Sequence, residues 1–175
     1  MELTNIKCEN LNSNIFELWK NKWMLLTCGD YEKNDFNTMT VAWGSFGHMW
    51  DRYFVQVVVR PSRFTYGFME KYDTFTLSAF SDQYQDALML LGTKSGRDGN
   101  KISEAGLTPL ASEKIAAPAF AEAELIFECK KMYWDDLAPK NFLDAKITQL
   151  YPDQDFHRIY FGEILVVRGE DKYGK

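Results

Sequence analysis

The stretch "NTMTVAWGSFG", Asn37 to Gly47, alternates like a β-strand and then ends in small residues. Successive side chains of a strand point to opposite faces, so Thr38, Thr40 and Ala42 share one face. The other face carries the larger apolar side chains. A core strand seldom places two hydroxyls and an alanine in a row on one face. The pattern therefore predicts a strand that lies against something other than an ordinary apolar core.

Further strands are predicted on both sides of this stretch. "KWMLLTCGD" (Lys22 to Asp30) precedes it and ends in a Gly-Asp turn, so the two segments are expected to form a hairpin. "YFVQVVVR" (Tyr53 to Arg60) follows it, and its β-branched apolar residues indicate a buried strand. Four more segments have strand patterns: Asp73 to Phe80, Ala121 to Trp134, Phe142 to Pro152, and Arg158 to Glu170.

Only short helices are predicted between the strands. Ser62 is a predicted N-cap for a helix over residues 64–72, and Ser81 for a helix that Gly92 ends. "KISEAG" is expected to form one helical turn. Because the strands mostly lack helical crossovers, the sequence predicts a mainly β fold, an antiparallel barrel with two or three short helices. The length of 175 residues fits a single domain over 1–175.

The composition excludes several classes of function. Hydrophobic residues make up 46% of the chain, enough for a sizeable core. The net charge is -5, so the chain has no general electrostatic reason to bind nucleic acid. Three widely spaced cysteines (Cys8, Cys28 and Cys129) and two histidines argue against a disulfide framework or a metal site.

The N-terminal "MELTNIKCENLNSN" is polar and lacks the pattern of a signal peptide. No apolar stretch approaches the ~20 residues that a membrane helix needs. The sequence alone therefore predicts a cytoplasmic protein that does not interact with a membrane.

A first basic cluster follows the strand that ends at Arg60. Arg60, Ser62, Arg63 and Thr65 surround a predicted junction between a strand and a helix. Free N–H groups at a helix start favour an anion, and arginine adds donors suited to phosphate. The cluster fits either a phosphate pocket or a capped helix with two surface arginines.

A second basic cluster occupies the loop "TKSGRDGNK", with Lys94, Ser95, Arg97 and Lys101 in or next to glycine-containing segments. It resembles a Walker A loop only superficially, because Thr93 stands where that motif requires glycine. A solvated basic loop explains this cluster when it is taken alone. Two such clusters in an acidic protein make a phosphate-bearing ligand the stronger hypothesis.

Several longer segments together resemble the flavin reductase-like proteins, in particular the flavoredoxin-type branch. The matching segments are "NTMTVAWGSFG", "VVVRPSRFTYGFME", "FTLSAF", "LGTKSGRDGNKISEAGLTP" and "HRIYFGEI". They keep the order of the family and span residues 37–164. The resemblance implies an FMN-binding split barrel that forms a homodimer, with the flavin near the subunit interface.

The resemblance also assigns the candidate residues. It places the isoalloxazine ring along Asn37, Thr38, Met39, Thr40, Ala42 and Trp43. It implies that some of Arg60, Ser62, Arg63 and Thr65 bind the phosphate, together with Lys94, Ser95 and Lys101. His157 matches the histidine before the family's Gly-Glu strand and is the candidate catalytic residue, placed near the flavin or the nicotinamide. Bulky residues in "GHMW" (Gly47 to Trp50) are expected to reduce the room for a substrate.

Three functions remain open from the sequence. The first is an NAD(P)H-dependent flavin reductase, with NADH or NADPH as the electron donor. The second is a flavoredoxin-like electron carrier that holds FMN and exchanges electrons with a redox partner protein. The third is a module on the same barrel that binds pyridoxal phosphate or haem without flavin chemistry.

Overall fold

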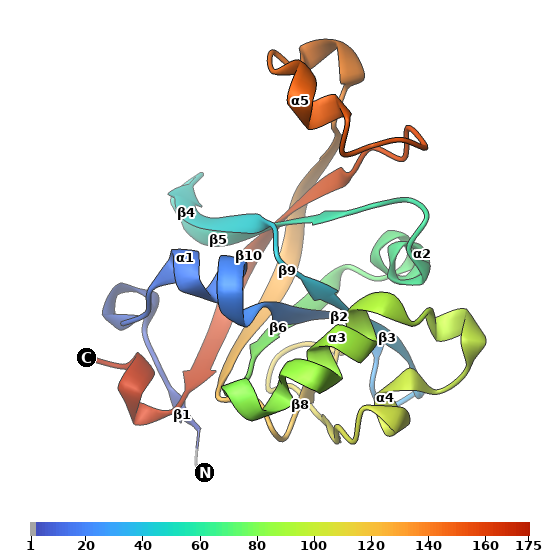
Figure 1. Cartoon of the computed structure of the whole chain (residues 1–175). Coiled ribbons are helices and arrows are strands. Elements are labelled where there is room, and N and C mark those ends of the chain that lie inside the picture. Colours follow the sequence, from blue (N-terminus) through green and yellow to red (C-terminus); the bar gives the residue numbers. More distant parts are fainter. Residues whose placement is uncertain (1–2) are drawn as a thin grey trace.

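The computed structural model describes residues 3–175, and antiparallel strands dominate it (Figure 1). Seven strands form one path in the order β3-β2-β6-β9-β10-β5-β4, and β1 pairs with the far end of β10. Two further strands, β7 and β8, form a small separate ladder. The strands are β1 (Thr4–Asn5), β2 (Met24–Asp30), β3 (Asp35–Val41), β4 (Gly44–Met49), β5 (Arg52–Val59), β6 (Thr74–Ala79), β7 (Pro109–Leu110), β8 (Ala119–Phe120), β9 (Leu125–Asp136) and β10 (Arg158–Gly169).

Short helices fill the connections between these strands. The two longest are α2 and α3, and both contact β3. The helices are α1 (Ile15–Glu17), α2 (Phe64–Lys71), α3 (Gln85–Thr93), α4 (Lys101–Glu104) and α5 (Ala145–Thr148), with a π-helical turn over Leu18–Lys22. Single 3-10 turns cover Cys8–Asn10, Asp82–Tyr84, Gly96–Asp98, Pro139–Asn141 and Asp171–Tyr173. The mainly β, split-barrel fold class is confirmed, and the sheet is not closed into a complete ring.

The predicted hairpin of β2 and β3 sits at one end of the sheet. Leu26 pairs with Met39 and Thr27 pairs with Thr38. Because side chains alternate across a strand, β2 contributes to two cores. Leu26 belongs to the larger core and Leu25 to a smaller core beneath α3 and α4. Burial on both faces explains why the first three residues of β2, Met24 to Leu26, are all apolar rather than alternating.

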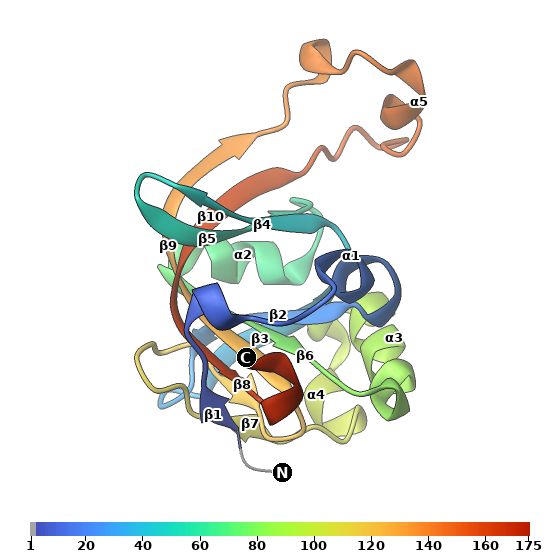
Figure 2. The ribbon, with the colours of Figure 1, turned by 90° about the vertical axis from the view of Figure 1, so that its left-hand side faces the viewer.

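The predicted strand over Phe142–Pro152 is wrong. β9 and β10 pair up to Asp136 and Arg158, so the chain between them leaves the sheet and has no partner strand. This segment, residues 137–157, forms an arm that carries α5 and extends away from the other elements (Figure 2). Phe142, Tyr151 and Phe156 pack together within the arm.

Three local predictions also need correction. Ser62 does not cap α2: Arg63 holds the N-cap position, and the Ser62 hydroxyl donates to Asp155 instead. Ser81 makes no capping bond from its side chain. Gly92 lies inside α3, which ends one residue later at Thr93. A Cβ on Gly92 would lie 3.1 Å from Thr40 Cβ, so the glycine allows α3 to pack closely against β3.

Gly162 in β10 gives a sharp test of the core. A Cβ at this position would lie 2.4 Å from Phe75 Cζ and 3.1 Å from Cys129 Cβ, and both residues are fully buried. Gly162→Ala is expected to lower the free energy of unfolding by about 1–3 kcal/mol through overpacking. Gly67→Ala is the matched control, because a Cβ in the middle of α2 meets nothing within 4 Å. Urea denaturation should show this control to be as stable as the wild type or slightly more stable. An equal loss of unfolding free energy in both variants would contradict the close packing around Gly162.

Candidate functional site

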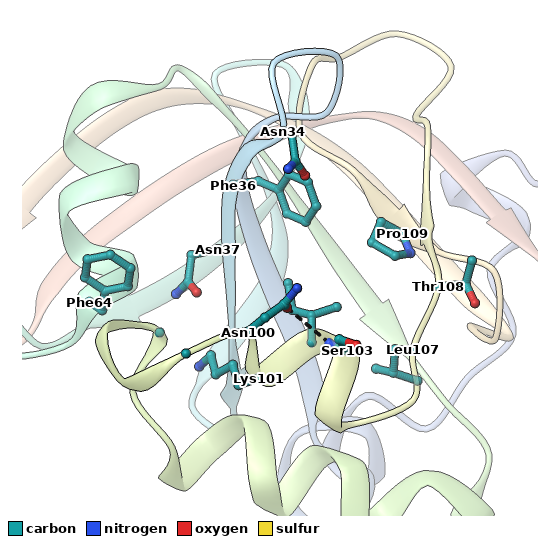
Figure 3. Close-up of a pocket in the computed structure, with 13 residues that line it drawn as sticks. Asn34, Phe36, Asn37, Phe64, Asn100, Lys101, Ser103, Leu107, Thr108 and Pro109 are labelled. Atoms are coloured by element: carbon teal, nitrogen blue, oxygen red, sulfur yellow. Dashed lines mark hydrogen bonds between the residues drawn. The ribbon is translucent and has the colours of Figure 1, made fainter.

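Three cavities lie in a row along β3, and each takes lining residues from a different part of that strand. The strand-end pocket, about 190 Å³, is lined by residues 39–43 together with Val58, Arg60 and His157. The cation pocket, about 110 Å³, includes Asn37 and Met39. The outer cleft, about 470 Å³, includes Asn34, Phe36 and Asn37 (Figure 3). A ligand that follows β3 would pass through all three.

The cation pocket joins the two basic clusters that the sequence suggested. The rest of its lining comes from the start of α2 and from the loop between α3 and α4: Ser62, Arg63, Phe64, Thr65, Thr93, Lys94, Ser95, Gly96, Arg97 and Lys101. Among residues 3–175, no aspartate or glutamate lines it. In a chain of net charge -5, this pocket is a concentrated positive site. The arrangement is suited to a phosphate.

Lys101 is the cation held most deeply in this pocket. Its ammonium donates to the carbonyl oxygens of Leu91 at 2.9 Å and Lys94 at 3.0 Å, and only 4% of the residue is exposed. Burial, together with the nearby Arg63 guanidinium, lowers the pKa of Lys101 to about 8. Within residues 3–175 it has no carboxylate partner. A buried cation that lacks a counter-ion favours an anion in the adjoining space.

Asn37, Thr65 and Gly96 fix the shape of this pocket. The Asn37 side-chain amide donates to the Thr65 hydroxyl at 2.7 Å and so ties β3 to α2. A Cβ on Gly96 would lie 2.5 Å from Asn37 Oδ1 and 2.6 Å from the Phe64 ring. Only glycine allows the loop after α3 to approach this closely. Sequence reasoning did not single out Gly96, although its place in "TKSGRDGNK" was a usable signal.

Several of the predicted site residues have other partners; the Thr40 hydroxyl, for example, donates to the Leu88 carbonyl at 2.5 Å. Arg60 donates to Asp155 at 2.8 Å, and its side chain lines the strand-end pocket rather than the cation pocket. Ser62 donates to the same carboxylate at 2.8 Å, although the residue lines the cation pocket. Lys94 forms an ion pair with Glu104 at 2.6 Å at the edge of the cation pocket.

Thr38 lines neither the strand-end pocket nor the cation pocket. It is fully buried, and its hydroxyl donates to the Leu26 carbonyl at 3.1 Å. It also accepts from Thr27. Its side chain therefore turns toward β2, and its place along a flavin ring stays a prediction.

The strand-end pocket contains His157, held by a tyrosine that the sequence prediction missed. Tyr151 and His157 are both buried, and the Tyr151 hydroxyl lies 2.8 Å from His157 Nδ1. The Trp43 ring lies 5.3 Å from the imidazole. Burial, together with the neighbouring Arg60 guanidinium, lowers the pKa of His157 to about 4, so the imidazole is neutral at pH 7. Tyr151 lies in the arm, and no local pattern near it indicated this contact.

The expected crowding by "GHMW" does not occur in this pocket. Gly47 to Met49 end β4, and Trp50 lies in the turn before β5. The Trp50 ring packs near Tyr133 and Phe161, 6.1 Å from each. None of these lines the strand-end pocket.

Residues 3–175 contain no group of three histidine, cysteine, aspartate or glutamate side chains placed to hold a metal ion. Within the same range, no helix combines the length and apolar character needed to cross a membrane. Cys28 and Cys129 are buried, and burial raises the pKa of Cys28 to about 12.

Comparison with solved structures supports the fold. An FMN-binding domain of a flavin reductases-like enzyme from Shewanella baltica aligns with a TM-score of 0.69, 15% identity, and coverage of 96% of this chain and 77% of that one. Flavoredoxin of Desulfovibrio vulgaris aligns with a TM-score of 0.66, 22% identity, and coverage of 85% and 69%. An NADH:FAD oxidoreductase from Streptomyces globisporus aligns with a TM-score of 0.63 and 16% identity, and the alignment covers 83% of this chain and 73% of that one.

Sequence comparison extends this likeness. An uncharacterized protein of Aquifex aeolicus is 28% identical over 97 residues, which are 55% of this chain and 41% of that protein. The match thus spans less than half the length of that relative. A model of the family described as "Flavin reductase like domain" matches residues 20–173, almost the whole chain. This match, together with the fold, shows that the chain belongs to the flavin reductase-like family.

Proposed function

We propose that this chain binds FMN and acts as an NAD(P)H-dependent flavin reductase. In this proposal the phosphate occupies the cation pocket and the isoalloxazine ring occupies the strand-end pocket. One observation carries the proposal: the cation pocket gathers Arg63, Lys94, Arg97 and Lys101 without a lining carboxylate from residues 3–175. Met39 lines both pockets, so in this proposal the ribityl chain passes Met39 on its way from one pocket to the other.

The free edge of β3 also fits a flavin ring. In the described part of the chain, β3 pairs with β2 alone and forms one end of the sheet. The outer N–H and C=O groups of such a strand are available to a ligand. Small side chains such as Ala42 let the polar edge of a ring approach them. This combination explains why "NTMTVAWG" does not resemble an ordinary core strand.

His157 is proposed to act as a hydrogen-bond donor beside the ring. If Nδ1 carried the proton, the buried Tyr151 hydroxyl would need another acceptor, and no other partner for it exists within residues 3–175. Tyr151 therefore donates to Nδ1, which leaves the proton on Nε2. Nε2 has no partner in the same range and can donate to flavin or to a reduced nicotinamide. Bound FMN supplies the electron chemistry, and the protein supplies placement.

Anaerobic absorbance spectroscopy tests the reductase proposal. The FMN-reconstituted protein is mixed with NADH or NADPH in the absence of oxygen, with dithionite as a positive control. Loss of the flavin absorbance with a nicotinamide donor supports the reductase. Flavin absorbance that persists with both donors but bleaches with dithionite overturns it.

An electron carrier is the second candidate, and the size of the strand-end pocket favours it. At about 190 Å³ this pocket is small for a flavin ring and a nicotinamide together. A carrier would be reduced by a redox partner protein rather than by NADH. The nicotinamide arm of the same spectroscopic experiment distinguishes the two functions.

FMN affinity is expected to fall as the pH rises through about 8. Below that pH the Lys101 ammonium keeps its proton and attracts phosphate; above it the free protein loses the charge, because its pKa is lowered to about 8. Phosphate monoesters are already doubly charged above pH ~7, so the ligand changes little. Calorimetric titration should show FMN binding weakened roughly tenfold between pH 7 and pH 9. Riboflavin is the control, and an equal loss for riboflavin would contradict the assignment to Lys101.

The lowered pKa of Lys101 has the opposite effect on the stability of the free protein, which should increase with pH. The unfolded chain binds the Lys101 proton up to its ordinary pKa of ~10.4. Between about 8 and that value the unfolded state therefore holds more protons than the folded state. The free energy of unfolding of the flavin-free protein should rise with pH across this window.

We also propose a homodimer, because the arm exposes apolar side chains. Leu143 is fully exposed, and Leu150 and Ile147 are 50% and 39% exposed. The arm extends away from the molecule and places these residues where a second copy could cover them (Figure 2). Light scattering should give twice the 20.4 kDa chain mass. Leu143→Asp together with Leu150→Asp should shift the protein to the single chain; a wild-type monomer at micromolar concentration would contradict the dimer.

A further inference from the structure

Asp155 in the arm bridges two residues that belong to different cavities. Its Oδ1 accepts a hydrogen bond from Arg60 at 2.8 Å, and its Oδ2 accepts one from the Ser62 hydroxyl at 2.8 Å. Arg60 lines the strand-end pocket, whereas Ser62 lines the cation pocket. One carboxylate therefore connects the proposed ring site with the proposed phosphate site, and it also fastens the arm to the segment that follows β5.

On the strand-end side, this bridge reaches His157 through Arg60 and Tyr151. The Arg60 guanidinium donates to the Leu150 carbonyl at 2.9 Å and lies 4.8 Å from the centre of the Tyr151 ring. A guanidinium in this position attracts the face of an aromatic ring. The Tyr151 hydroxyl in turn lies 2.8 Å from His157 Nδ1. By holding Arg60, the Asp155 carboxylate therefore supports the tyrosine that fixes the tautomer of the imidazole.

On the cation-pocket side, the same carboxylate opposes the binding of a phosphate. A hydroxyl has a single proton, so Ser62 cannot donate to a phosphate while it donates to Asp155. The carboxylate also places a negative charge directly behind a residue that lines the pocket, and this charge repels an anion. The bridge therefore lowers the affinity of the cation pocket for a phosphate while it orders the strand-end pocket.

We propose that Asp155 is a positioning residue that fixes the His157 donor and at the same time weakens the binding of the flavin phosphate. This inference rests on the proposed flavin function and deepens it, because it assigns opposite effects to one side chain at the two ends of the flavin. Loss of a residue that only held the arm in place would weaken both ends. The opposite signs therefore separate the positioning role from a general structural one.

Two variants of Asp155 test the proposal. Asp155→Asn keeps the shape of the side chain, but an amide has one acceptor oxygen, which must face Arg60 because a guanidinium only donates. The amide NH2 group then faces Ser62, whose hydroxyl can turn its proton toward the cation pocket. Asp155→Ala removes both hydrogen bonds. Asp153→Asn is the matched control, because Asp153 lies in the same arm, is exposed and lines none of the three cavities.

Calorimetric titration with FMN measures the effect at the phosphate end. Both Asp155 variants should bind FMN about five- to tenfold more tightly than the wild type, which is the gain expected from one freed hydrogen bond. Riboflavin affinity should change less than about twofold, because this ligand has no phosphate. The Asp153→Asn control should bind both ligands as the wild type does.

Nitrogen NMR of labelled histidine in the flavin-free protein measures the effect at the other end. The wild type and Asp153→Asn should show His157 as one neutral tautomer. Asp155→Ala should show a mixture of the two neutral tautomers, because Tyr151 loses the support of a fixed Arg60. This signal does not depend on bound flavin or on its reduction.

FMN affinity that is unchanged or weaker in both Asp155 variants would overturn the inference, and so would a single unchanged tautomer in Asp155→Ala. Equal weakening of FMN and riboflavin in the variants would assign Asp155 a purely structural role and also overturn it. These outcomes leave flavin binding by the wild type intact. If the wild type binds no FMN, the proposed function itself fails, and this inference fails with it.

Discussion

Replacing Lys101 with methionine is expected to weaken FMN binding about a hundredfold and to leave riboflavin binding within about twofold. The ammonium is buried beside the cation pocket and bonds only to carbonyl oxygens among residues 3–175. A charged hydrogen bond to phosphate in such a place contributes roughly 1.5–3 kcal/mol, and a hundredfold change corresponds to about 2.7 kcal/mol. Methionine keeps most of the side-chain length and apolar volume. The loss should therefore come from the missing charge.

Calorimetry with both ligands separates this effect from general damage. Lys114→Met is the matched control, since Lys114 is exposed and lines none of the three cavities. The control should bind both ligands as the wild type does. Equal weakening of FMN and riboflavin in Lys101→Met would show that the site has collapsed. Unchanged FMN binding would show that the phosphate does not lie at Lys101.

Replacing His157 with phenylalanine is expected to slow reduction of the bound flavin by NADH about a hundredfold. The phenyl ring keeps the contact with Trp43 but removes the Nε2 donor from the strand-end pocket. Loss of one preorganised donor next to reacting atoms typically slows a reaction by about 10²–10³-fold. Anaerobic stopped-flow absorbance measures this rate, and reduction by dithionite should be unchanged. If NADH reduces the bound flavin as fast in the variant as in the wild type, His157 has no role in this step.

Tyr151→Phe tests how the imidazole is held. Without the hydroxyl at 2.8 Å, nothing fixes the Nδ1 lone pair, and both neutral tautomers become populated. The rate of flavin reduction by NADH should fall about tenfold, a smaller loss than in His157→Phe. Nitrogen NMR of labelled histidine should show one tautomer in the wild type and a mixture in Tyr151→Phe. A single unchanged tautomer in the variant would contradict the positioning role of Tyr151.

The sequence predicted the features that depend on local pattern. The β2–β3 hairpin, the two longer helices and the two basic clusters all follow from short-range alternation, helical periodicity and charge, although the predicted caps were wrong. The structure brings Arg63 and Lys101 to one pocket, although 38 residues separate them in the sequence. The resemblance to a family supplied what local pattern could not: the order of the segments and the ligand.

The missed features depend on distant partners. Arg60 and Ser62 share Asp155, which lies more than 90 residues further along the chain. No local pattern could have shown that this carboxylate neutralises the first basic cluster and leaves Arg63 to face the cation pocket. The segment Phe142 to Pro152 was misread as a strand because apolar residues recur along it; the aromatic residues of the arm are Phe142, Tyr151 and Phe156. They pack on one another and on His157 instead.

A titration that compares FMN with riboflavin tests the central claim most directly. The two ligands share the ring and differ by the phosphate alone, and the cation pocket is the only feature proposed to bind that group. FMN is expected to bind the wild-type protein at least about a hundredfold more tightly than riboflavin at pH 7. Equal affinities would contradict a phosphate site between Arg63 and Lys101, regardless of whether the ring binds in the strand-end pocket.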